Sequence, residues 1–351
     1  MNDWAFVRAE DSLVESLGVL GTFVRDGTEF RRARLYAAGV LYDRFEYKAE
    51  FDFADRFANF NDVYVGLRDV PVLGTLKAGH FREPFGLEAL TSSNHITFLE
   101  RSAGAAFAPL RNTGIAFQNS IAEGRINYSA GVFRQSLNAG DSVGSGGPNL
   151  TARVTGLPVY ADGGRKFLHV GAAYSHQGTP LDVALFGSRP EAHLLPTFVL
   201  TPLLETSSYD MVGLEAAAVA GPFSVQSEYM KASVDSVPSG DPTFSGFYVL
   251  GNFFLTGEHR RYWHGGGAFD RIRPNRSFLD EGGIGAWEIA ARYSQLDLND
   301  RMVRGGEMKN FTFGVNWYVN PYSRIMWNYV RSEVVNTGNA DIVQMRFKID
   351  F

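Results

Sequence analysis

The sequence predicts an all-β protein, folded as a transmembrane antiparallel β-barrel of about sixteen strands. Strict alternation is the first reason, because residues 343–351 alternate apolar and polar side chains and end on an aromatic residue. Second, similar segments recur along all 351 residues without the linkers that would separate domains. Third, no run of about 18 apolar residues exists, which excludes a membrane-spanning helix. We therefore expect residues 1–351 to form a single barrel domain.

The strands are expected to begin, in order, near residues 13, 30, 44, 61, 74, 112, 124, 150, 167, 208, 223, 245, 284, 308, 323 and 341. The third segment shows the pattern, because Phe45, Tyr47 and Phe51 share one face while Glu46 and Lys48 share the other. Segments 287–294, 311–318 and 324–329 repeat it. In a soluble β-sandwich or propeller, the alternative folds, apolar faces would meet across a core. In a membrane barrel they meet lipid.

The connections give the barrel a direction. An even number of strands brings both chain ends to the periplasmic side, where turns are short, while longer loops face outward. Short connections such as 41–44, 70–73, 220–222 and 320–322 fit this rule. The connection at about 257–283 is long yet periplasmic by the same count, and it is basic. We expect it either to fold back into the pore, extending an attractive path for anions, or to hang free as a solvated or partner-binding loop.

Composition excludes several classes of function. The chain has no Cys, so it has neither disulfides nor thiolate metal sites, which suits export through an oxidising compartment. A net charge of −5 predicts no nucleic-acid partner, and the seven His show no metal-binding spacing, so we expect no metal and no cofactor. Outward positions are almost entirely apolar, which leaves no place for a surface hydrolase site, so an enzyme is not expected. No secretory signal precedes Asn2, and we expect Met1 to begin a mature or truncated form.

Alternation also predicts which charges face the lumen, where water fills the channel and a constriction focuses the field. The basic side chains assigned inward are Arg32, Arg34, Lys48, Arg68, Lys77, Arg153, Arg292, Arg324, Arg346 and Lys348. Acidic side chains also point inward, so any one arginine either attracts anions or pairs across strands. Arg32 and Arg34 are two residues apart, about 7 Å along the strand, and form a short basic ladder. Arg31 is expected to face the other way unless a bulge turns it.

Several segments resemble the phosphate-selective porin O and P family of Gram-negative outer membranes. The matching segments are residues 30–35, 45–48, 90–93, 96–102, 107–112, 254–258, 285–294, 316–318 and 328–330. The most specific is Gly79-His80-Phe81-Arg82-Glu83-Pro84-Phe85-Gly86-Leu87-Glu88, which opens a long third loop. The resemblance implies a sixteen-stranded homotrimer whose third loop, about 83–111, folds inward as an anion-preferring constriction.

The resemblance also implies a set of anion-binding residues. The loop serines and arginine match Ser92, Ser93 and Arg101, the wall arginine pair matches Arg31 and Arg32, and Asp62 matches an acidic neighbour. Arg34 of the ladder and Arg111 at the end of the loop motif complete the predicted set. A loop lysine of the phosphate-binding members is missing, because Ala89 stands at its place. A looser selectivity than strict phosphate selectivity fits this departure.

These observations predict passive, anion-biased diffusion of phosphate-like or other small anionic solutes through a water-filled pore of the outer membrane. The expected partners are small anions, outer-membrane lipid and lipopolysaccharide, and two further copies of the chain. One alternative is a general, weakly selective porin. The other is a structural or interaction barrel with a closed lumen, in which long loops such as 177–207 bind a surface partner.

Overall fold

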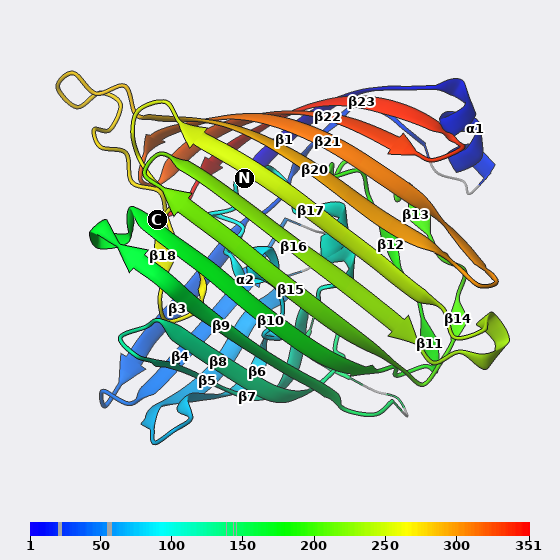
Figure 1. The fold of residues 1–351 in the computed structure, drawn as a ribbon, viewed down its shortest axis with the longest axis horizontal. Coiled ribbons are helices and arrows are strands. Elements are labelled where there is room, and N and C mark those ends of the chain that lie inside the picture. Colours follow the sequence, from blue (N-terminus) through cyan, green and yellow to red (C-terminus); the bar gives the residue numbers. More distant parts are fainter. Residues whose placement is uncertain (20–22, 55–57, 138, 143, 145) are drawn as a thin grey trace.

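The computed structural model describes residues 1–351 except 20–22, 55–57, 138, 143 and 145. Its main sheet has 17 strands joined in antiparallel pairs. Two of them, β2 (Gly27–Phe30) and β3 (Arg34–Leu41), are halves of one crossing that is interrupted at residues 31–33. The sheet closes on itself because β1 (Asn2–Ala9) pairs with both β2 and β23 (Gly338–Ile349). Over the described residues the barrel therefore has sixteen crossings, which confirms the predicted fold class (Figure 1).

The remaining strands follow one another around the barrel, each pairing with its neighbours in sequence (Figure 1). They are β4 (Phe45–Asp52), β5 (Asn59–Val70), β6 (Gly74–Arg82), β7 (Arg111–Ile121), β8 (Ile126–Arg134), β9 (Asn149–Ala161), β10 (Lys166–Gly178), β15 (Ser208–Ala220), β16 (Phe223–Val234), β17 (Thr243–Phe254), β20 (Ala286–Asp300), β21 (Val303–Asn320) and β22 (Ser323–Val334). Because Asn2 pairs with Phe347, both chain ends lie at the same end of the barrel. The predicted strand starts lie close to these bounds from the second strand onward.

The first predicted strand, beginning near residue 13, is wrong. That segment is a helix, α1 (Asp11–Val19), and the strand that closes the barrel is β1, which precedes it. Leu13 and Leu17 are both buried, and a spacing of four residues puts them on one face of a helix, whereas Glu15, which would share that face in a strand, is exposed. The helix rests against β23 at the end of the barrel opposite to the chain termini.

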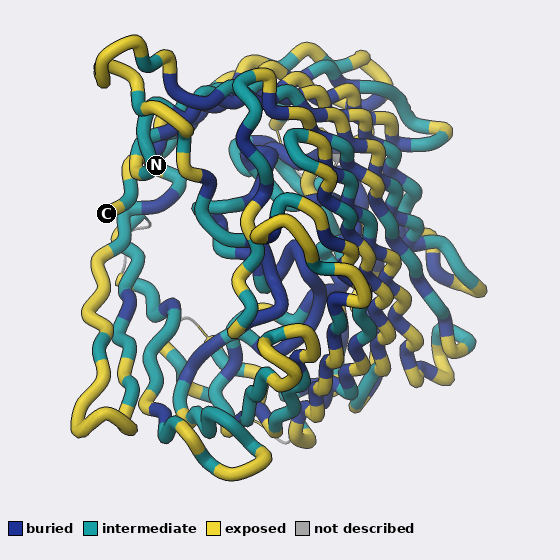
Figure 2. Tube along the Cα trace, turned by 60° about the vertical axis from the view of Figure 1, so that its left-hand side comes forward, coloured by how far each residue is buried: buried dark blue, intermediate teal, exposed yellow. Residues whose placement is uncertain are grey.

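The barrel wall reverses the distribution of apolar and polar side chains that is usual in a soluble protein. On β15, outward Val212 and Leu214 are 45% and 54% exposed, whereas inward Met211 and Glu215 are buried. Figure 2 shows the same alternation as neighbouring buried and exposed positions along the strands. Apolar side chains outside and polar side chains inside suit a wall that faces lipid on one side and water or packed loops on the other. Among the described residues, no helix is long and apolar enough to cross a membrane.

Three connections turn into the barrel. Residues 83–110, the third loop, carry α2 (Leu87–Leu90) and η1 (Ala103–Phe107). Residues 179–207, between β10 and β15, carry β11 (Val183–Ala184), β12 (Gly187–Ser188), β13 (Val199–Leu200) and β14 (Leu204–Glu205). Residues 255–285 carry a hairpin of β18 (Tyr262–Trp263) and β19 (Ala268–Phe269). The first two share an apolar core with the wall that includes Phe85, Phe107, Phe186, Phe198, Met211, Met230, Phe244, Leu296, Met308 and Ile342.

The inward connections fill one side of the barrel interior, so the lumen is open on the other side. η1 contacts β16, β17 and β20, so the third loop lies on that side of the barrel. Strands there have fully buried inward positions, whereas on β3 residues 35–38 are exposed on both faces. Figure 2 shows this difference between the two sides of the wall. The open space therefore lies between the third loop and the strands β3 to β7. The two short helices η2 (Asp162–Gly164) and η3 (Val237–Ser239) lie in connections at the rims.

Candidate functional site

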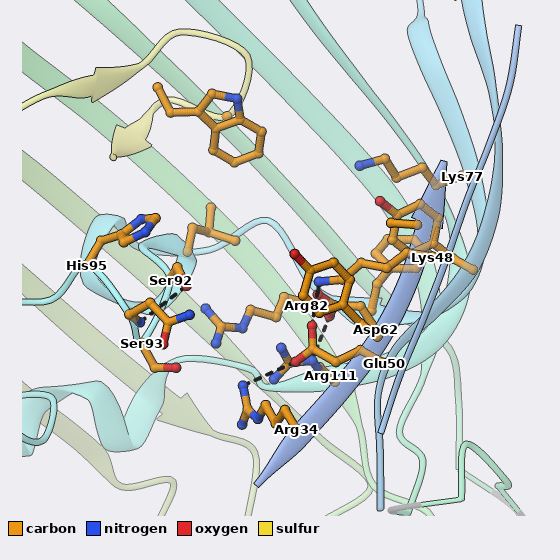
Figure 3. Close-up of a pocket in the computed structure, with 18 of the residues that line it drawn as sticks. Arg34, Lys48, Glu50, Asp62, Lys77, Arg82, Ser92, Ser93, His95 and Arg111 are labelled. Carbon is orange, nitrogen blue, oxygen red and sulfur yellow. Dashed lines mark hydrogen bonds and ion pairs between the residues drawn. The ribbon is translucent and has the colours of Figure 1, made fainter. Parts of the chain in front are cut away.

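The open side of the barrel contains a cavity of about 910 Å³ between the wall strands and the third loop (Figure 3). Among the described residues, its charged lining consists of the basic Arg32, Arg34, Lys48, Lys77, Arg82, Arg111, Arg153 and Arg271 and the acidic Glu50, Asp62 and Asp350. Basic groups therefore outnumber acidic groups in this lining. Because low-dielectric walls focus the field of such charges, the cavity attracts anions and disfavours cations.

Asp62 organises the charges on the wall side of the cavity. Its carboxylate accepts hydrogen bonds from Lys48 Nζ at 2.8 Å and from Arg111 Nε at 2.7 Å, so it links β4, β5 and β7. Glu50 lies next to it and pairs with Lys48 at 2.6 Å and with Arg34 at 3.3 Å. Each acidic group thus holds two basic side chains of the wall (Figure 3). Asp52 also pairs with Arg34 at 2.6 Å, so these basic side chains are fixed in place and their charge is balanced by three carboxylates.

The third loop supplies the opposite side of the cavity. Ser92 and Ser93 line it together with Leu90, Asn94 and His95. Ser92 Oγ accepts a hydrogen bond from the Asn94 backbone N–H at 3.3 Å, which leaves the hydroxyl hydrogen available to a solute. Burial, together with the charges of Lys348 and Arg271, lowers the pKa of His95 to about 4. Its imidazole is therefore neutral near pH 7 and adds no charge to the cavity.

Six of the eight residues predicted for anion binding line this cavity: Arg32, Arg34, Asp62, Ser92, Ser93 and Arg111. The other two are used by the third loop itself. Arg101 donates to the carbonyl oxygens of Glu88 at 2.9 Å, Ala89 at 3.3 Å and Thr91 at 2.9 Å, which holds the shape of the loop. Arg31 faces inward rather than outward, because the interruption between β2 and β3 turns it, and its guanidinium pairs with Glu100 at 2.9 Å.

Glu100 joins the loop to the wall. Burial would raise its pKa, but the guanidinium groups of Arg346, Arg31 and Arg32 hold the pKa of this carboxyl well below its usual range. The contact with Arg346 is 2.6 Å, and Arg346 also pairs with Asp3 on β1 at 2.5 Å. A charged Glu100 therefore fixes the loop to the two strands where the barrel closes.

Several cations assigned inward from the alternation hold the third loop instead of lining the cavity. Arg324 donates to the carbonyl oxygens of Ile96 and Thr97, both at 2.7 Å, and Lys348 donates to that of Asn94 at 2.6 Å. On the same wall, Glu228 accepts hydrogen bonds from the backbone N–H groups of Leu87 and Glu88, both at 2.7 Å. Backbone groups of the loop thus use the polar side chains of β16, β22 and β23, which fill this half of the barrel.

Arg292 on β20 joins two inward connections. Its guanidinium pairs with Glu88 of the third loop at 3.1 Å and with Glu191 of residues 179–207. Glu191 also accepts from Ser294 Oγ at 2.5 Å and Thr312 Oγ1 at 2.7 Å. Arg292 and Glu191 are 1% and 3% exposed, so this is a buried and fully bonded charge cluster.

The long connection at 257–283 contacts the lumen side of the wall. Arg153 on β9 pairs with Glu215 on β15 at 2.6 Å and donates to the carbonyl oxygens of Gly266 at 3.2 Å and Gly267 at 2.7 Å. The Tyr262 hydroxyl lies 2.8 Å from Nδ1 of the inward His169. Of the basic residues in this connection, Arg260 is buried against Phe269 and Gln226, Arg271 lines the cavity, and Arg261, Arg273 and Arg276 are exposed.

Arg82 was not assigned from the sequence. It differs in parity from the inward Lys77, so alternation places it outward. As the last residue of β6, however, it lies where the chain turns into the third loop, and its side chain enters the cavity (Figure 3). Lys48 and Lys77, in contrast, line the cavity as the alternation predicts. No group of His, Cys, Asp and Glu within the described ranges could hold a metal ion.

Comparison with known proteins bears on the whole chain. The model of a family described as phosphate-selective porin O and P matches residues 22–351. Porin O of Pseudomonas aeruginosa is 31% identical over 90% of this chain and 79% of that protein. Among solved structures, an anion-selective porin from Comamonas acidovorans shares the fold with a TM-score of 0.60 at 14% identity, covering 100% of this chain and 97% of that one. The trimer form of OmpT, an outer membrane protein of Vibrio cholerae, has a TM-score of 0.54 at 11% identity over 98% and 96% of the two chains.

Proposed function

The chain belongs to the phosphate-selective porin O and P family, and from this premise we propose that it forms an anion-selective outer-membrane pore. The proposed solutes are phosphate-like and other small anions, which cross by passive diffusion. The observation that carries the proposal is the lining of the open cavity, where eight basic side chains face three acidic ones among the described residues. The name of the Comamonas acidovorans protein, an anion-selective porin, agrees with it.

The proposed pore binds a passing anion through non-covalent contacts and does not change it chemically. Guanidinium groups stay charged at all relevant pH values and fork to two oxygens of an oxyanion, and the hydroxyls of Ser92 and Ser93 can donate to the same solute as it loses water. Partial neutralisation by Glu50 and Asp62 limits how strongly an anion is held, which conduction requires. We propose that residues 83–110 form the constriction, since their serines lie opposite Arg34 and Arg111 across the cavity.

We propose that the pore discriminates only weakly between different anions. Ala89, at the place where the resemblance implies a lysine, is 8% exposed and packs in the apolar core behind the third loop. No ammonium group therefore reaches the cavity from that position. Phosphate is expected to bind in competition with chloride rather than to the exclusion of other anions.

We further propose that the pore assembles as a homotrimer in the outer membrane. The trimer form of OmpT, which shares this fold, supports the proposal. The exposed apolar face of the strands would then divide between lipid and subunit contacts, and the rim opposite the chain termini would meet lipopolysaccharide. Heating-dependent migration of the purified protein in detergent gels would report the oligomer.

The test of the proposed function is the zero-current potential of the purified protein in planar bilayers across a gradient of KCl. Because the lining carries a surplus of basic groups, we expect the sign of this potential to show that chloride is more permeant than potassium. A potential of the opposite sign would contradict the proposal. Insertion without any current would favour the alternative of a closed barrel that works through its loops.

A further inference from the structure

Arg82 crosses the cavity from the wall to the third loop. Its side chain starts at the end of β6 and points toward Ser92 and Ser93 (Figure 3). The Nη1 atom donates to the carbonyl oxygen of Ala89 and, at 3.3 Å, to that of Thr91. Only this one nitrogen is bonded to protein within the described residues, so Nε and Nη2 keep donors that a solute in the cavity can use. The residue is partly exposed, and it lines the cavity.

A second guanidinium shares the same two carbonyl oxygens. Arg101 Nη2 donates to Thr91 O at 2.9 Å and to Ala89 O at 3.3 Å. Two like charges are thereby brought to one pair of acceptors. Like charges at such close range repel unless a counter-charge is near.

Among the described residues, no carboxylate forms an ion pair with Arg82. Most other basic groups of the lining have one: Arg34 pairs with Asp52 at 2.6 Å, Arg111 with Asp62 at 2.7 Å and Arg153 with Glu215 at 2.6 Å. In the part of the chain that the structure describes, Arg82 forms no such pair. Arg32 also lacks one, but it is only 7% exposed and its Nη1 lies 3.5 Å from Met1 Sδ. Within the described lining of the cavity, Arg82 is thus the partly exposed basic group that has no carboxylate partner.

We infer that Arg82 is the residue that determines oxyanion binding in this pore, with the solute held between its free guanidinium donors and the hydroxyls of Ser92 and Ser93. This inference rests on the proposed function and adds a specificity-determining residue to it. The guanidinium supplies the charge that Ala89 does not, and it does so from the wall rather than from the loop. A tetrahedral oxyanion such as phosphate can accept two parallel N–H groups from one guanidinium, which chloride cannot do.

The experiment compares Arg82→Gln, Arg82→Lys and the parent protein in planar bilayers, with inorganic phosphate added to a chloride current. Loss of a charge-assisted, forked contact is expected to weaken the block by phosphate roughly tenfold or more in Arg82→Gln. Arg82→Lys retains the charge but not the fork, so it is expected to keep the preference for chloride over potassium while phosphate block weakens. Arg331→Gln, which removes a basic group from the outer face of β22, serves as the matched control and is expected to behave like the parent.

Phosphate block of parental strength in both Arg82 variants would overturn the inference while leaving an anion-selective pore intact. A parent protein without anion preference would instead remove the proposed function itself, so the two failures are distinguishable. Arg82→Gln also deletes hydrogen bonds to the loop, and protection of Arg101 from trypsin reports whether the loop keeps its place. If trypsin cleaves at Arg101 in Arg82→Gln, the loop has moved and the test rests on Arg82→Lys alone. Weaker phosphate block in Arg82→Lys than in the parent would then support the inference, and block of parental strength would overturn it.

Discussion

Replacing Arg292 with Gln is expected to destabilise the folded barrel by about 3–5 kcal/mol, because it leaves two buried carboxylates without their cation. Glu88 and Glu191 both pair with this guanidinium, and neither can reach water. The loss should be visible as a lower midpoint of urea unfolding in detergent micelles. Since Glu88 belongs to the third loop, the loop should also leave the wall, and trypsin should then cut after Arg101.

Arg331→Gln is the control for this prediction. It removes a guanidinium of the same kind on β22, where the pair with Asp341 at 2.7 Å is exposed on the outer face. Exposed ion pairs contribute only about 0–1 kcal/mol, so its unfolding midpoint should stay close to that of the parent. Equal midpoints for Arg292→Gln and Arg331→Gln would show that the buried cluster does not anchor the loops.

Replacing Arg153 with Gln is expected to have a comparable cost, about 3–5 kcal/mol, but at the other inward segment. Glu215 is buried and loses its 2.6 Å partner, retaining only the imidazole of His169 at 3.0 Å. The hairpin of β18 and β19 also loses the two hydrogen bonds that Arg153 donates to Gly266 and Gly267.

The two variants are expected to differ in where the chain opens. In Arg153→Gln, trypsin should gain access to Arg260, which is 3% exposed in the folded protein, while Arg101 stays protected. Single-channel current should rise because the hairpin no longer narrows the lumen. Cleavage at Arg101 in both variants would mean that the inward segments form one unit rather than two separately anchored ones.

The strands could be predicted because each has two faces that meet different surroundings. On one face of β4 lie the apolar Phe45, Tyr47 and Phe51, and on the other face lie the charged Glu46 and Lys48. The alternation of the two faces can therefore be read from the residue types. The first strand was missed because α1 also begins with spaced apolar residues, whose burial depends on contact with β23 and the inward loops. A period of four and a period of two are hard to separate over so short a segment.

The position of the pore could not be predicted in the same way. Alternation correctly assigns Arg34, Arg324 and Lys348 inward. It does not show that Arg324 and Lys348 donate to carbonyl oxygens of the third loop. Every residue has a backbone carbonyl group, so the sequence does not show which carbonyl oxygens accept hydrogen bonds from these side chains. Arg101 was expected at the solute for this reason, although its guanidinium holds the loop. Alternation does not predict the inward position of Arg82, because the pattern fails where a strand turns into a loop.

The most direct test of this account asks which side of the barrel conducts. The chain has no Cys, so single cysteines report their own access to water. Ala38 on β3 lines the open cavity, whereas Ala290 on β20 is 4% exposed and lies under Phe98 of the third loop. We expect a charged, water-soluble thiol reagent to reduce the current through Ala38→Cys and to leave Ala290→Cys unchanged. Block of Ala290→Cys without block of Ala38→Cys would place the path on the other side of the third loop and contradict the account.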